Sequence, residues 1–137
     1  MHYSLKAVVR NTCLMLPALC SFVARADTLD AVVGRYESAQ PMACELTIEL
    51  REKDGRGIYT LTTTSRAVTG YFQLENDGII FSELFASDTN ASEPQAVTAV
   101  LEEGSLLIQN YGNSMNPYTV FGECAPKYLM LDRISAE

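Results

Sequence analysis

Hydrophobic and polar side chains alternate most regularly over residues 44–51, the segment CELTIELR. Because successive side chains of a β-strand point to opposite faces, this period of two predicts a strand with one face against a core. The predicted inward residues are Cys44, Leu46, Ile48 and Leu50, and the predicted outward residues are Glu45, Thr47, Glu49 and Arg51. After residue 26 the sequence has no helical stripe of useful length, so the pattern favours an all-β fold.

Similar short runs recur along the chain and are separated by turn residues, with Asp-Gly or Glu-Gly pairs at three of the junctions. The predicted strands are residues 34–38, 44–51, 58–64, 68–74, 78–85, 95–101, 105–111, 118–121 and 127–134. Eight or nine strands with short connections favour a small antiparallel meander closed into a barrel, and a two-sheet β-sandwich is the alternative. Residues 27–33 could add a short helix or a plug.

The first 26 residues have the composition of an export signal. A positively charged start is followed by an apolar stretch at residues 11–23 and by an Ala-Arg-Ala site at residues 24–26. The apolar stretch is much shorter than the roughly 20 residues that a membrane-spanning helix needs. We therefore predict a cleaved signal peptide over residues 1–26, a single β-barrel domain over residues 27–137, and a periplasmic or secreted location.

Cleavage would remove Cys13 and Cys20 and leave only Cys44 and Cys124. An even pair of cysteines in an exported protein predicts a structural disulfide. A Cys44–Cys124 bridge would close a loop of about 80 residues, for which the chain-entropy model gives an upper value of about 4.5 kcal/mol. It would connect an early strand to the end of the chain.

Charge narrows the classes of partner. The full chain has a formal net charge of −7, and loss of Lys6, Arg10 and Arg25 would leave −10. Nucleic acids and anionic membranes attract clusters of Lys and Arg, so neither is expected as a partner. The outward acids Glu45, Glu49, Glu102 and Glu103 could steer a basic protein partner, or they could serve only solubility.

Several kinds of chemistry are excluded by composition. The only histidine is His2, inside the predicted signal, so the remaining chain has no Ser-His-Asp or Cys-His site and no imidazole metal site. With both cysteines oxidised it has no thiolate either, and no cofactor or metal site is expected. Paired carboxylates could still act as the acid and nucleophile of a glycosidase, but the many acidic residues single out no pair.

Glu83 is the acidic residue with the most unusual position. It alternates with Ile79, Phe81 and Phe85 in the segment GIIFSELF, so a regular strand would place it on their face. If that face is inside the barrel, Glu83 would be a buried acid with a raised pKa and a candidate ligand contact. The alternative is that Ile80, Ser82 and Leu84 point inward and Glu83 faces water.

The densest group of neutral polar and aromatic side chains is residues 109–118, QNYGNSMNPY. Amides and tyrosine rings suit the recognition of a protein or sugar surface. The alternative is a structural loop in which Asn and Gly satisfy backbone groups. The predicted binding residues are Asn110, Tyr111, Asn113, Asn116, Tyr118 and Glu83.

Two short segments carry a resemblance to known barrels. Gly34-Arg35-Tyr36 and the closing run Tyr128-Leu129-Met130-Leu131-Asp132-Arg133 resemble the ends of calycin-type barrels such as lipocalins and small bacterial metalloprotease inhibitors, although Tyr36 stands where those families have Trp. The Cys44–Cys124 pairing would also differ from the short disulfide loop of the inhibitors. The resemblance implies that Tyr36 packs against Arg133 at the barrel base, and it implies a binding function.

These observations together predict an exported, non-enzymatic binding protein that inhibits or neutralises another protein, such as a hydrolase. The alternative is a carrier of a small apolar or amphipathic ligand inside the barrel, with Glu83 or Arg133 holding a polar end. An interior filled by Phe72, Phe81 and Leu106 would count against the carrier.

Overall fold

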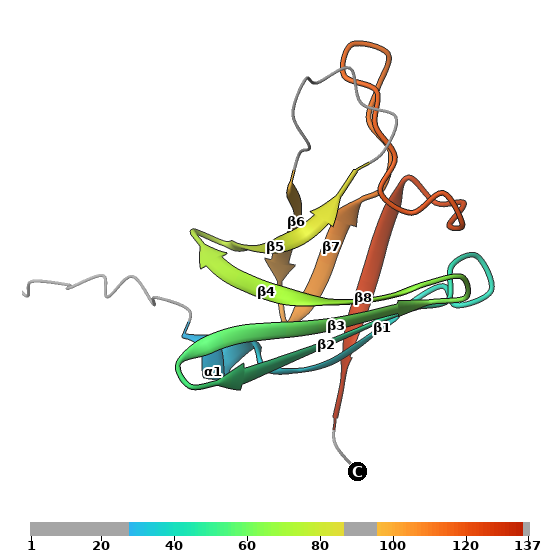
Figure 1. Ribbon diagram of the computed structural model, residues 1–137. Helices are drawn as coiled ribbons and strands as arrows, with labels where there is room; N and C mark the ends of the chain where they lie inside the picture. The colour runs from blue at the N-terminus through green and yellow to red at the C-terminus, as the bar shows by residue number, and fades with distance from the viewer. Residues whose placement is uncertain (1–27, 87–95, 136–137) are drawn as a thin grey trace, which may run out of the picture.

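A computed structural model describes residues 28–86 and 96–135 (Figure 1). Eight strands follow one another in chain order and close into an antiparallel barrel, with β1 hydrogen-bonded to β8. The elements are α1 (Leu29–Val32), β1 (Gly34–Ser38), β2 (Leu46–Lys53), β3 (Arg56–Thr63), β4 (Ala67–Glu75), β5 (Gly78–Phe85), β6 (Ala96–Glu102), β7 (Ser105–Gln109) and β8 (Tyr128–Ile134). The predicted all-β barrel is confirmed, and the sandwich is not what forms. The predicted signal peptide and the Asn90-Ala91-Ser92 sequence, a match to a glycosylation motif, lie outside the described residues.

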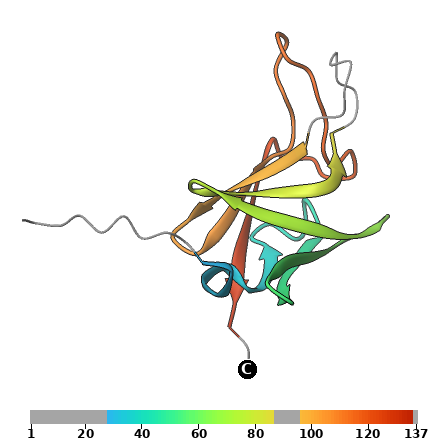
Figure 2. The same ribbon diagram turned by 60° about the vertical axis from the view of Figure 1, so that its left-hand side comes forward.

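The two ends of the barrel differ in their connections. At the end that we call the turn end, β2–β3, β4–β5 and β6–β7 are joined by two residues each, and the first of each pair has a positive φ: Asp54, Asn76 and Glu103. Such tight turns match the twist of the strands they join. At the opposite end, the loop end, the connections are longer, and the chain between β7 and β8 projects away from the barrel (Figures 1 and 2). Loops of this kind carry the variable, functional surface of a rigid scaffold.

One predicted strand, residues 118–121, does not form. Only an isolated bridge between Tyr111 and Thr119 is present there, and β7 ends at Gln109 rather than at residue 111. The reason is that Val120 and Phe121 are consecutive and both buried, whereas a strand would point them to opposite faces. They turn into the loop end of the barrel instead of extending the sheet.

Aromatic side chains fill the barrel interior. Phe72, Phe81 and Leu106, whose burial would count against a carrier, are all buried. Tyr59 lies edge-on to Phe81, with ring centroids 5.0 Å apart. Tyr59 also lies directly across from Gly70, where an added Cβ would come within 2.9 Å of the tyrosine ring and hydroxyl. Glycine at this position therefore makes room for a large ring inside a small barrel.

The short helix α1 covers the turn end. A short helix was one of the two possibilities given for residues 27–33. Its Val32 is fully buried, and the buried Tyr36 hydroxyl donates a hydrogen bond of 2.7 Å to the Val32 carbonyl. Arg133 donates to the carbonyls of Ala31 and Val33, so it holds the end of the helix. Tyr36 and Arg133 are directly opposed in the pairing of β1 with β8, which confirms their expected proximity.

Of the two alternatives left open for Glu83, the one in which it points inward is wrong. The pairing of β5 with β6 runs regularly to Phe81 and then shifts, which marks a β-bulge over residues 82–84. Glu83 has a φ of 63° within this bulge and is exposed, while Ile79, Phe81 and Leu84 point inward. The extra residue shifts which positions of the strand point inward, from every second residue up to Phe81 to Leu84 after it. Neither of the two regular alternations considered from the sequence therefore holds over the whole strand. The Tyr59 hydroxyl donates a 2.7 Å hydrogen bond to the Ser82 carbonyl at the bulge.

Candidate recognition surface at the loop end

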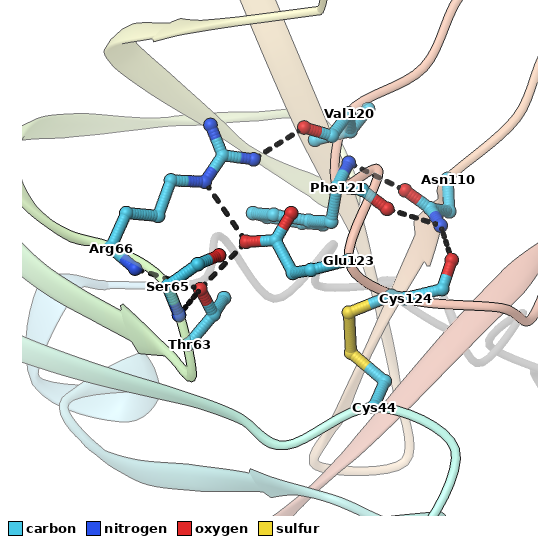
Figure 3. A network of polar contacts seen from close by, with 9 residues as sticks. All are labelled: Cys44, Thr63, Ser65, Arg66, Asn110, Val120, Phe121, Glu123 and Cys124. Carbon is cyan, nitrogen blue, oxygen red and sulfur yellow. Dashed lines mark hydrogen bonds and ion pairs between the residues drawn. A yellow bond between two sulfur atoms is a disulfide. The ribbon is translucent and has the colours of Figure 1, made fainter.

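The segment between β7 and β8 is held against the barrel by one buried amide. The Asn110 side chain is fully buried, and its Nδ2 lies 3.0–3.1 Å from the carbonyl oxygens of Phe121, Cys124 and Pro126. Its Oδ1 accepts a 2.7 Å hydrogen bond from the Phe121 N–H. Figure 3 shows this amide facing the backbone of the chain that follows. Asn110 therefore satisfies backbone groups that would otherwise be buried without partners.

A disulfide holds the same segment from the other side. Cys44 and Cys124 are bonded, with Cα atoms 4.6 Å apart, and both are buried (Figure 3). The predicted bridge is confirmed. It connects the β1–β2 loop to the β7–β8 segment, and the Ala125 N–H donates to the Ala43 carbonyl beside it. Two loops far apart in sequence are thus joined at the loop end.

A third attachment comes from the β3–β4 turn. Arg66 lies 3.2 Å from the Glu123 carboxylate and donates to the Val120 carbonyl, and its guanidinium stands over the Phe121 ring. The Thr63 hydroxyl donates a 2.6 Å hydrogen bond to the same carboxylate. Burial alone would raise the pKa of Glu123, but the hydrogen bonds from Thr63 and the backbone, together with the charge of Arg66, hold that pKa below its usual range. The ionised carboxylate is therefore the form that the fold favours.

Residues 111–118 form a projecting hairpin on this support. The Gly112 N–H donates to the Tyr118 carbonyl, and the Asn113 N–H donates to the Asn116 carbonyl, at 3.0 and 3.1 Å. The Asn113 side-chain oxygen accepts from the N–H groups of Met115 and Asn116, both at 2.9 Å. This Asx arrangement closes the tip. Met115 is 91% exposed at that tip.

A groove of about 400 Å³ lies between the hairpin and the outer face of the sheet. Tyr118 and Asn116 line it from the hairpin, while outward side chains of β6, β7 and β8 line it from the barrel, among them Val100, Gln109 and Tyr128. None of its lining residues in the described ranges carries a charge. Burial raises the pKa of Tyr118, and the neighbouring Tyr128 adds to this, so the Tyr118 ring stays a neutral phenol.

The structure places the predicted binding residues in different environments. Asn113, Asn116 and Tyr118 lie in the hairpin or its groove. Tyr111 is half-buried at the foot of the hairpin, where its hydroxyl donates to the Cys124 carbonyl at 2.7 Å. Asn110 is buried, so a partner cannot touch its side chain. For this residue the alternative of a structural loop, in which Asn satisfies backbone groups, is the correct one. Glu83 is exposed but does not line the groove.

Met115 and the Arg66–Glu123 pair were not among the predicted site residues. Met115 lies in the polar run of residues 109–118, but its apolar side chain gives no local signal that it is exposed. No sequence signal joins Arg66 to Glu123, because 57 positions separate them. Their contact depends on the closure of the barrel.

Acidic side chains gather at the turn end, away from the hairpin. They lie in α1, in the tight turns or next to them: Asp30, Glu52, Asp54, Glu75, Asp77, Glu102 and Glu103. Of the four acids expected to steer a partner, Glu102 and Glu103 belong to this group. Glu49 is paired with Arg51 at 3.3 Å, and Glu45 is exposed directly before β2, at the loop end. Any electrostatic attraction by the turn end therefore acts on a different part of the surface from the hairpin.

Comparison with protein-family models, with curated proteins and with solved structures finds no match to the chain. Within residues 28–86 and 96–135, no helix has the length and apolar character needed to cross a membrane.

Proposed function

We propose that the protein is an exported, non-enzymatic binding protein that inhibits or neutralises another protein, and that it contacts its partner with the loop end. The observation that carries this proposal is the contrast between hairpin and support. The hairpin is exposed at residues 113–116 and presents amide and thioether groups beside the half-buried rings of Tyr111 and Tyr118. The segment behind it is held by Asn110, a disulfide and the Arg66–Glu123 pair. A rigid support with an exposed loop is typical of pre-organised inhibitors.

The filled interior favours this function over the carrier. Phe72, Phe81 and Leu106 occupy the space that a ligand would need. Val32 at the turn end and Phe121 at the loop end are both fully buried, so side chains occupy both ends of the interior. A ligand could enter only after substantial rearrangement of a close-packed core.

A non-enzymatic role rests on the composition after residue 26, which lacks histidine, and on the use of both remaining cysteines in the disulfide. The position of Arg133 opposite Tyr36 at the turn end supports a relationship to calycin-type barrels as part of this proposal. Members of that group bind ligands or inhibit enzymes, and the filled interior favours the second role here.

Affinity capture tests the proposal. The exported, oxidised protein is immobilised, exposed to an envelope extract of the source organism, and eluted in steps of salt and then denaturant. The same experiment is run with Asn113→Ala, which removes the acceptor that closes the hairpin tip. Glu103→Ala, in the tight turn at the other end, is the matched control.

We expect a stoichiometric protein that the control variant retains and that Asn113→Ala loses. If the retained protein is a hydrolase, its activity should fall when the protein is added in equal amount. A small molecule released on denaturation, with no protein retained, would contradict the proposal and favour the carrier. Equal retention by both variants would place the contact away from the hairpin.

A further inference from the structure

Building on the proposed function, we infer that Met115 is the central anchor of the contact. The hairpin inserts this side chain into an uncharged, apolar pocket of a protein partner. The partner is thus a protein with a concave site, such as the cleft of an enzyme, rather than one with a flat or strongly basic surface. The inference rests on exposure, rigidity and charge, taken in turn.

Exposure singles out Met115 within the hairpin. It is 91% exposed, whereas the aromatic residues of the same hairpin, Tyr111 and Tyr118, are half-buried and pack at its foot. A flexible, polarizable thioether fits pockets of irregular shape, which makes methionine a frequent contact residue at binding surfaces. Burial of such a side chain removes a large apolar area from water. The tip therefore offers one apolar group that is free to enter a pocket.

Rigidity makes this position more than a mobile loop end. Gly112 allows the two sides of the hairpin to approach closely, because a Cβ there would lie 2.0 Å from the Asn116 carbonyl oxygen. Asn113 fixes the tip through two hydrogen bonds, and the Tyr111 hydroxyl fixes the foot. Groups that are ordered before binding lose less conformational entropy when the complex forms. The hairpin thus holds the backbone of Met115 in place before it meets a partner.

Charge defines the kind of pocket. Residues 111–118 have no charged side chain, and the groove beside them has none among its lining residues in the described part of the chain. The acidic group lies at the turn end. A rim of the partner pocket fits the groove beneath the tip, where Tyr118 and Tyr128 supply aromatic walls. Because neither the tip nor the lining of the groove carries a charge, we expect the affinity of this contact to depend only weakly on salt.

Substitution of two equivalent methionines provides the first test. Met42 is fully exposed in the β1–β2 loop and lies outside the hairpin, so Met42→Ala is a matched control for Met115→Ala. The protein retained in the capture experiment serves as the probe, and its Kd is measured by surface plasmon resonance at low and high salt. We expect Met115→Ala to raise Kd by roughly 30-fold or more, as for a central hot spot, and Met42→Ala to raise it by less than about twofold.

Gly112→Ala then separates rigidity from contact. This variant keeps Met115 but cannot keep the close approach at Asn116, so we expect a loss of affinity of similar size. Far-UV circular dichroism and urea unfolding show whether the barrel is intact in each variant. If Gly112→Ala binds like the wild type, the hairpin need not be pre-organised, and that part of the inference is wrong.

Oxidation gives a second, independent measurement. Dilute hydrogen peroxide converts exposed methionine to the polar sulfoxide, and mass spectrometry follows each site. Free protein should react at both methionines, whereas the complex should protect Met115 and leave Met42 reactive. Suppose that the wild type captures a protein, and that Met115→Ala binds it with the same Kd or that the complex leaves Met115 as reactive as Met42. Either result overturns the inference and leaves the proposed function standing. Capture of no protein by the wild type overturns both.

Discussion

Replacement of Asn110 by Ala should weaken the attachment of the β7–β8 segment to the barrel, while the disulfide and the Arg66–Glu123 pair remain. The side chain is fully buried, and its two N–H hydrogens are shared among three backbone carbonyls while its oxygen accepts from the Phe121 N–H. Alanine can make none of these bonds. The variant would leave buried backbone groups of the segment 121–126 without partners, although nothing in the exposed hairpin has been altered.

The magnitude follows from the bonds that are lost. Two donated hydrogen bonds and one accepted bond, at about 1 kcal/mol each, give about 3 kcal/mol. The Phe121 N–H, which is left buried without an acceptor, adds about 1 kcal/mol more. A loss of about 3–4 kcal/mol is a large part of the roughly 5–15 kcal/mol by which a domain is stable. Equilibrium urea unfolding of the oxidised protein, followed by far-UV circular dichroism, measures this difference directly.

Asn113→Ala is the control, because it removes an amide from the same loop at an exposed position. We expect it to lower the free energy of unfolding by less than about 1 kcal/mol. A loss below about 1 kcal/mol for Asn110→Ala would refute the reasoning. It would show that the disulfide and the packing of Phe121 hold the segment without the amide.

Three further predictions concern other parts of the structure. Replacement of both Cys44 and Cys124 by Ser should lower the unfolding free energy by up to about 4.5 kcal/mol, measured against the oxidised wild type in urea. Because the pKa of Glu123 is below its value of about 4.3 in an unfolded chain, the carboxylate stabilises the fold fully at neutral pH, and this contribution fades as the pH falls through the folded-state pKa. Glu123→Gln should therefore be less stable than the wild type at pH 7, with a smaller difference at pH 3, and an equal difference at both pH values would contradict this. Gly70→Ala should cost about 1–3 kcal/mol in the same assay, because the new Cβ would meet the Tyr59 ring and a backbone oxygen at 2.9 Å, and an unchanged midpoint would show that the ring can move.

Much of the barrel could be predicted because its signals are local. In β2 the alternation of Leu46, Ile48 and Leu50 with polar residues matches the observed inward and outward faces. The three turn-end connections were recognisable from their Asp-Gly or Glu-Gly pairs, and Gly55 and Gly104 do have a positive φ. The disulfide followed from the count of cysteines once the signal peptide was set aside. Each of these inferences needs only a few neighbouring residues or a simple count.

The candidate site depended on contacts between distant residues, so only the tertiary structure decided it. Asn110 has the same composition signal as Asn113, yet one is buried against backbone groups 11 to 16 residues away and the other is at the exposed tip. Glu83 faces water because an irregular pairing of β5 with β6 changes the phase of the strand. By itself, the sequence determined the strand order, the turns and the disulfide, because alternation and turn preference act over a few residues. Which polar side chains became support and which stayed available to a partner was decided by barrel closure, since only closure brings together the donors and acceptors that satisfy a buried amide.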